Sequence, residues 1–206
     1  MTKTTAASTL TVDAIAAQTY TGSAIEPAVT VRDGETVLTQ GTDYSVAYSD
    51  NTAGGTATVT ITGLADAGAT AATKYLGTKE VNFTIGKATP VITLAAASLT
   101  LQQSTTGSVA VSSVKIGELD VTDRVDITYS SDTPSVASVA ADGTVTGVVV
   151  GNATITVTAT PKSADAGNMN AVSAEYAVHV SYGVGTQNTV GDWGDGGTTN
   201  DTDMHF

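Results

Sequence analysis

Few residues in this 206-residue chain could carry proton-transfer chemistry, since its only histidines are His179 and His205. A Ser-His-Asp relay requires the three side chains to meet in space, and the spacing of the many serines and aspartates predicts no such meeting. His179 alternates out of phase with the apolar residues Tyr176, Val178 and Val180, so we expect it to face solvent from a strand. The sequence therefore predicts no catalytic residue and no enzyme.

Cysteine is absent, which excludes disulfides, thiolate catalysis and Cys-based zinc sites. Oxygen ligands for calcium could come from four aspartates near the C-terminus: Asp192, Asp195, Asp201 and Asp203. Their spacing does not fit the Asp-x-Asp-x-Asp-Gly loop. An acidic, Gly-rich segment that is unfolded when free is the favoured interpretation, so no metal and no cofactor are predicted.

The same C-terminal segment holds three large apolar side chains, those of Trp193, Met204 and Phe206. The segment is too rich in glycine to build a core of its own, so these side chains must be buried elsewhere or stay exposed. We expect them to dock on a partner subunit or back on the second domain. Deletion of residues 191–206 should then weaken assembly and leave the thermal melt of the folded domains nearly unchanged.

The charge balance narrows the classes of partner. Twenty acidic residues against 8 basic ones give a net charge of −12. Nucleic-acid binding draws on clustered positive charge, whereas the basic residues here are scattered, so no nucleic-acid partner is expected. The acidic balance also repels anionic lipid headgroups, and no run of 18 apolar residues could span a bilayer. Membrane insertion is therefore not expected either.

The elements that would position a site are short strands, and the clearest ones lie in residues 130–159. Two alternating runs flank Asp142-Gly143, which predicts a β-hairpin with a type I′ turn. The strand that follows places small or aliphatic residues on one face: Ala153, Ile155, Val157 and Ala159. Threonines occupy its other face, a pattern typical of a strand with one buried side.

Similar alternation runs through the rest of the chain. Residues 56–62 and 80–85 predict strands, Asp33-Gly34 predicts a second hairpin, and residues 65–74 are interpreted as a surface excursion. The residues expected to face inward in these two strands are Ala57, Val59, Ile61, Val81, Phe83 and Ile85. Short strands with frequent turns and no convincing helix predict an all-β chain of two tandem β-sandwiches.

The expected boundaries are a flexible N-terminus at residues 1–7, a first domain at 8–87, a second domain at 88–182 and an acidic tail rich in glycine and aspartate at 183–206. The two domains share a sequence pattern: Gly55–Thr62 and Gly151–Thr158 show the same alternation at a separation of 96 residues. A repeat near the length of one small domain indicates the same kind of unit used twice.

The second domain resembles the bacterial immunoglobulin-like (Ig-like) domain of group 2 over about residues 91–181. The resemblance is carried by Tyr129–Asp132, Pro134–Ala137, Asp142–Gly147 and Gly151–Ile155. Tyr129 stands where the family often has Trp, and Pro161–Ala171 looks like an insertion before the last strand. The resemblance implies an Ig-like β-sandwich.

The first domain looks like another Ig-like repeat of bacterial surface proteins. That resemblance is carried by Tyr20–Gly22, Ala24–Pro27, Gly41–Tyr44, Gly55–Val59, Tyr75–Lys79 and Phe83–Ile85. Both resemblances imply adhesion or display, on bacterial surfaces and on phage virions alike. Neither family supplies a catalytic motif.

Two functional classes follow. The preferred one is a non-enzymatic structural or display protein on a bacteriophage virion surface, as a capsid decoration or fibre component. It explains a chain that begins at Met1 without an apolar export signal. Its expected partners are capsid or tail subunits in a homo- or hetero-oligomeric assembly, together with host-surface glycans. The alternative is a fragment of a secreted bacterial adhesin or surface-layer protein, located outside the cell or on its surface.

Overall fold

The computed structural model describes residues 5–6, 10–64 and 75–183. The chain divides into two compact units, the first formed by residues 1–93, 112–127 and 158–173 and the second by residues 94–111, 128–157 and 174–206. The predicted division at residues 87 and 88 stays a prediction. Among the described strands, no sheet combines a strand from before residue 87 with one from after it.

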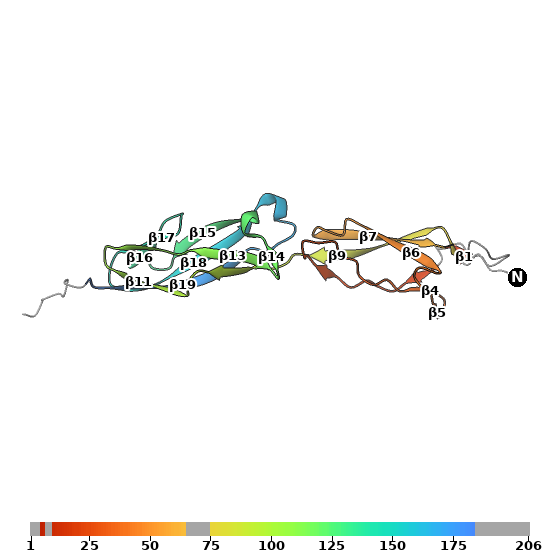
Figure 1. Cartoon of the computed structure of the whole chain (residues 1–206), viewed down its shortest axis with the longest axis horizontal. Coiled ribbons are helices and arrows are strands. Elements are labelled where there is room, and N and C mark those ends of the chain that lie inside the picture. Colours follow the sequence, from red (N-terminus) through yellow and green to blue (C-terminus); the bar gives the residue numbers. More distant parts are fainter. Residues whose placement is uncertain (1–4, 7–9, 65–74, 184–206) are drawn as a thin grey trace, which may run out of the picture. The chain divides into compact units, whose positions relative to one another are not determined.

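The described residues before residue 87 form nine strands, several of which are labelled in Figure 1. They are β1 (Thr5–Ala6), β2 (Thr11–Val12), β3 (Gln18–Thr19), β4 (Val31–Asp33), β5 (Thr36–Val37), β6 (Tyr44–Ser49), β7 (Gly55–Gly63), β8 (Tyr75–Leu76) and β9 (Thr78–Gly86). One sheet has the order β3-β9-β7-β6, another has the order β2-β4-β5, and β1 pairs with β8. The predicted hairpin at Asp33-Gly34 is confirmed, since Asp33 pairs with Thr36 across its loop.

The core of these sheets follows the alternation of the sequence. Ala57, Val59 and Ile61 on β7 are buried, as are Phe83 and Ile85 on β9, whereas Val81 is only partly buried. Apart from Val81, the inward-facing residues are thus the expected ones. These predictions are confirmed, because a strand that packs one face on the core must place every second side chain there. The intervening threonines of β7 are only partly buried.

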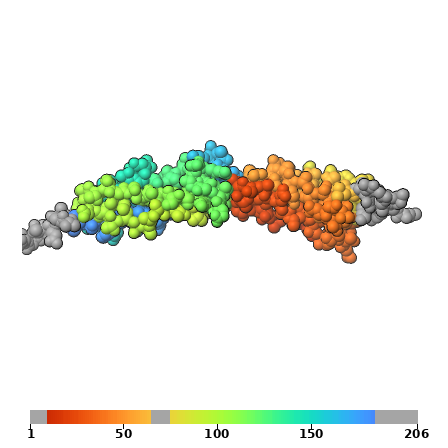
Figure 2. All heavy atoms as spheres, in the orientation of Figure 1, coloured from red at the N-terminus to blue at the C-terminus, as the bar shows by residue number. Residues whose placement is uncertain are grey.

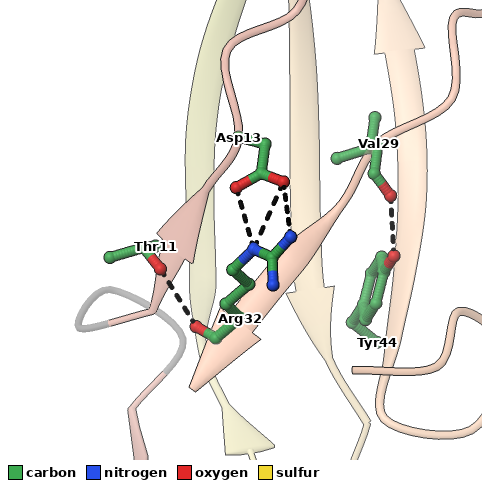
Figure 3. Close-up of polar contacts among 5 residues, drawn as sticks. All are labelled: Thr11, Asp13, Val29, Arg32 and Tyr44. Carbon is green, nitrogen blue, oxygen red and sulfur yellow. Dashed lines mark hydrogen bonds and ion pairs between the residues drawn. The ribbon is translucent and has the colours of Figure 1, made fainter. Parts of the chain in front are cut away.

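Two polar contacts tie irregular backbone to this framework (Figure 3). The buried hydroxyl of Tyr44, on β6, donates to the carbonyl oxygen of Val29 at 2.8 Å and so links the two sheets. Arg32, on β4, donates through Nε and Nη2 to the carboxylate of Asp13 at 3.0 to 3.2 Å, just beyond the end of β2. The guanidinium hydrogen bond lowers the pKa of Asp13, and the fork-shaped contact holds the short β2 strand against β4.

Residues 88–183, all of them described, form ten strands. They are β10 (Val91–Leu94), β11 (Ser98–Gln102), β12 (Thr106–Ser108), β13 (Val111–Ile116), β14 (Leu119–Asp120), β15 (Val125–Ser131), β16 (Ala137–Val139), β17 (Thr144–Gly147), β18 (Gly151–Pro161) and β19 (Val172–Ser181). They form sheets of order β11-β19-β18-β15, β10-β13-β14 and β12-β17-β16. The 3₁₀ turns Thr122–Arg124 and Ser163–Asp165 are the only helical elements among the residues in this part of the described chain.

The buried face of β18 is the predicted one, formed by Ala153, Ile155, Val157 and Ala159. On β19 the buried residues are Tyr176, Val178 and Val180, also as predicted. The all-β class is therefore confirmed, with sheets that each bury one face as in an Ig-like β-sandwich. No helix in the described ranges has the length and hydropathy needed to cross a bilayer.

The predicted hairpin at Asp142-Gly143 exists, but its turn is not type I′. Strands β16 and β17 pair antiparallel from Val139↔Val145 to Ala137↔Gly147. Gly143 has φ +83° and donates its N–H to the carbonyl of Ala140 at 3.0 Å, whereas Asp142 has no positive φ. A type I′ turn needs positive φ at both central residues, so a longer loop closed by one left-handed glycine replaces it. The Asp142 carboxylate instead accepts the N–H of Thr144.

A hairpin between β13 and β14 was not predicted. Lys115 pairs with Asp120 and Ile116 with Leu119 around Gly117, which has φ +55°. Val114 and Val121, which flank this hairpin, are both fully buried. The run Ile116–Leu119 contains one glycine and no strong turn pair, so the sequence signal was weak.

Candidate functional site

A shallow depression of about 310 Å³ lies on the sheet of β11, β19, β18 and β15. Its lining includes three side chains of the types found in a hydrolytic relay, those of Ser98, Asp132 and His179. The remaining polar lining comes from Thr100, Asn152 and Thr154.

The geometry does not assemble a relay. His179 is exposed, as predicted, and its Nδ1 lies 2.7 Å from Oδ1 of Asn152. Asp132 accepts the backbone N–H of Thr154 at 2.8 Å, a hydrogen bond that lowers the pKa of this carboxyl group. Between the described residues, no hydrogen bond joins His179 to Asp132 or to Ser98.

Strand register explains why Ser98 stays apart from the histidine. Ser98 pairs with Ala177, whereas His179 pairs with Thr100. Ser98 and His179 are therefore offset by two residues, about 6.6 Å along the strands. The hydroxyl of Tyr176 donates to the carbonyl of Ser98 at 3.0 Å, so this backbone carbonyl is already hydrogen-bonded within the fold. The depression is an open surface groove with both polar and apolar lining; the face of the described residues drawn in Figure 2 shows no deep hollow.

Other candidates from the sequence fall outside the described residues. Trp193, Met204 and Phe206 lie there, and so do His205 and the C-terminal aspartates proposed as calcium ligands. Among the described residues, no three His, Asp or Glu side chains gather where they could hold a metal ion. The docking role of Trp193, Met204 and Phe206 stays a prediction.

The feature that sequence reasoning missed is the parallel pairing of an early strand with the last strand. Strand β11 runs parallel to β19, with five residue pairs in register from Ser98↔Ala177 to Gln102↔Ser181 (Figure 1). The pairing is extended at one end, where Gln103 donates its N–H to the carbonyl of Ser181 at 2.9 Å. Beside it, the hydroxyl of Ser181 donates to the carbonyl of Leu101.

The same arrangement recurs before residue 87. Strand β3 runs parallel to β9, with Gln18 opposite Ile85 and Thr19 opposite Gly86. Tyr20 then donates its N–H to the carbonyl of Gly86 at 2.9 Å. In both cases an early strand pairs in parallel with the last strand of the same sheet, β3 with β9 and β11 with β19, although β3 is shorter than β11.

Parallel pairing fixes how tension along the chain would act. The backbone enters β11 at Ser98 and leaves β19 at Ser181, which are at opposite ends of the paired region because the strands run in one direction. Tension applied at Ser98 and at Ser181 would therefore pull the two strands past each other. All the ladder hydrogen bonds are loaded together, whereas a pull on one end of a strand pair would break them one at a time. The arrangement can resist force, and its neighbouring groove holds no assembled catalytic group.

Comparison with known proteins agrees on the class of fold. Residues 87–168 match the family model of the bacterial Ig-like domain (group 2), which confirms the Ig-like prediction for that part of the chain. The earlier Ig-like repeat and the phage origin stay predictions. Comparison with curated proteins found no match.

Similar solved structures include the S-layer protein rSbsC(31-844), at 19% identity and a TM-score of 0.35 over 88% of this chain and 29% of that one. Domains 4 and 5 of the S-layer protein SbsC match at 19% identity and a TM-score of 0.33, covering 73% of this chain and 89% of that one. Fibronectin(III)-like modules of Clostridium thermocellum CbhA match at 14% identity and a TM-score of 0.34, covering 84% and 94%. This chain thus spans under a third of the length of rSbsC(31-844), and these likenesses concern the fold alone.

Proposed function

We propose that this chain is a non-enzymatic structural segment of a bacterial cell-surface protein, which displays or spaces other parts of that protein and carries tension along its backbone. The observation that supports this proposal is the parallel pairing of β11 with β19 over five residue pairs.

Further features of the described residues are consistent with this role. The outward faces of β7 and β18 carry threonines, and charged residues make up only 14% of the chain. Threonine keeps an outward strand face polar and supplies β-propensity without charge. The segment can therefore remain in solvent while its inward faces hold the sandwich together. Its proposed partners are other subunits of the same surface assembly and surface glycans.

Location is the point on which the two functional classes differ. A virion decoration or fibre would use the same mechanical property, so the fold does not choose between them; the family match to bacterial Ig-like domains supports the cell surface. Immunogold labelling with antibodies against the purified chain tests this directly. The antibodies should be applied to intact cells and, in parallel, to particles collected from the supernatant of cultures after prophage induction.

Labelling of intact cells is the expected result. Labelling confined to phage-like particles would overturn the cell-surface location in favour of the virion. Label found only after the cells are permeabilised would overturn both locations. The tension-carrying role is tested separately by force spectroscopy, so a failure of location and a failure of mechanics are distinguishable.

A further inference from the structure

An apolar patch lies at the end of β19, made of Val148 and Val149 in the loop after β17 together with Tyr182 just after β19. These side chains are 40%, 50% and 55% exposed and are among the few large apolar residues of the described chain that remain so open. We refer to these three residues as the end patch. Isolated exposed apolar residues are ordinary, but three at one place indicate a contact surface.

Hydrogen bonds show that the three residues are neighbours. Gln103 donates its backbone N–H to the carbonyl of Ser181 at 2.9 Å and its side-chain Nε2 to the carbonyl of Val148 at 3.1 Å. Gln103 therefore connects Ser181, the residue before Tyr182, with the loop that holds Val148 and Val149. A Cβ built on Gly147 would lie 3.1 Å from a methyl group of Val180, so the loop begins in contact with β19.

The patch is also fixed in place. The N–H groups of Val148 and Val149 both donate to the carbonyl of Val136, at 2.8 and 3.2 Å. Glycine at 151 lies against the side chain of Val136, since an added Cβ would meet it at 3.3 Å. The two valines are thus presented outward by backbone bonds. A surface that is already ordered loses little conformational freedom on binding.

We propose that residues 184–206 of the same chain cover the end patch and that Trp193 is the side chain that packs against it. The segment begins two residues after Tyr182. Trp193 is 11 residues beyond Tyr182, and a chain of that length reaches about 36 to 40 Å when extended. Reach is therefore ample for contact with a patch that begins at Tyr182 itself.

Connectivity selects this occupant over a second copy. A segment joined to its site by a short linker is present at an effective concentration of about 1 mM, far above that of a second copy in a micromolar solution. The segment is rich in glycine and aspartate, so its few large apolar side chains have no core of their own. Docking of this segment is independent of the tension-carrying role.

Trp193 is the single tryptophan of the chain, which makes the proposal directly testable. Its fluorescence emission reports its own environment without interference. In the full chain we expect emission shifted to the blue of the urea-unfolded chain, together with protection from acrylamide quenching. The double variant Val148→Ser with Val149→Ser should lose both the shift and the protection while its thermal melt stays close to that of the original chain.

A matched control is Val37→Ser with Val91→Ser, since these two valines are 55% and 64% exposed and lie outside the patch. The control should keep the blue-shifted emission. Emission in the original chain equal to that of the unfolded chain would overturn the proposal. So would a blue shift that survives in the Val148 and Val149 variant, or one that disappears on dilution from tens of micromolar to nanomolar protein, which would assign the patch to a second copy.

Discussion

In a force spectrometer the parallel pairs β3–β9 and β11–β19 should each give a rupture event, and the two rupture forces should differ. The β11–β19 pair holds five residue pairs in register. At about 1 kcal/mol of net stabilisation for each hydrogen bond, these amount to about 5 kcal/mol, or roughly 35 pN nm. In shear they must break within a displacement of about one residue, roughly 3.3 Å. Work divided by distance gives a rupture force of about 100 pN.

The β3–β9 pair should yield first. It has two residue pairs in register, so the same arithmetic gives about 40 pN. The released lengths identify the events. Residues 18–86 enclose 69 residues and residues 98–181 enclose 84, which correspond to about 250 Å and about 300 Å of extended chain.

The expected trace is therefore a shorter extension at lower force, followed by a longer extension at higher force. Equal rupture forces for the two events would refute the link between register length and resistance. The reverse order would refute it as well. If both extensions appeared at no more than about 20 pN, the force for breaking single bonds in sequence, the shear interpretation itself would be wrong.

Three further predictions concern stability. Gly143→Val should lower the free energy of unfolding, measured in urea, by about 2 to 5 kcal/mol. Placing valine in a left-handed backbone conformation costs about 1 to 2 kcal/mol, and crowding costs about 1 to 3 kcal/mol because the added Cβ would lie only 2.6 Å from a backbone carbonyl oxygen. A loss below about 0.5 kcal/mol would contradict the turn geometry. Ile155→Ala should cost about 2 to 5 kcal/mol because the side chain is fully buried, whereas its outward neighbour Thr156→Ala should change stability by less than about 0.5 kcal/mol. The pKa of Asp132 is lowered in the folded chain by the N–H of Thr154, so its stabilisation is present above the unfolded-state pKa of about 3.9 and is lost as pH falls through the lower folded pKa. Thermal melts between neutral pH and about pH 2 should thus show a shallower acid loss for Asp132→Asn than for the original chain, and parallel curves would exclude this linkage.

The sequence predicted which side chains face the core but not which strands lie together. Alternation assigns Val157 and Val178 to buried faces because a strand has a period of two. That pattern is identical for parallel and antiparallel neighbours, so it could not reveal that Leu99 lies opposite Val178 in a parallel pair. Partner choice depends on contacts between residues nearly 80 positions apart, and local spacing does not encode them.

Turn chemistry was predictable only in part. Asp142-Gly143 correctly marked a reversal of the chain, because glycine is the residue that adopts positive φ most readily. The turn type depends on where the strands stop pairing, which is set by β16 ending at Val139. Similarly, His179 was correctly placed on the solvent side of its strand, but its hydrogen bond to Asn152 required knowledge of the neighbouring strand.

The most direct test of the central claim changes only the direction of pull on the β11–β19 pair. Because the chain has no cysteine, a pair of introduced cysteines gives two defined attachment points. Ala97→Cys with Tyr182→Cys loads the strand pair in shear, and Gln103→Cys with Tyr182→Cys peels it from one end. Rupture is expected near about 100 pN in shear and near about 20 pN in peeling, the force for about 1 kcal/mol over about 3.3 Å. Equal forces in the two geometries would contradict the claim that the terminal strands resist tension in shear.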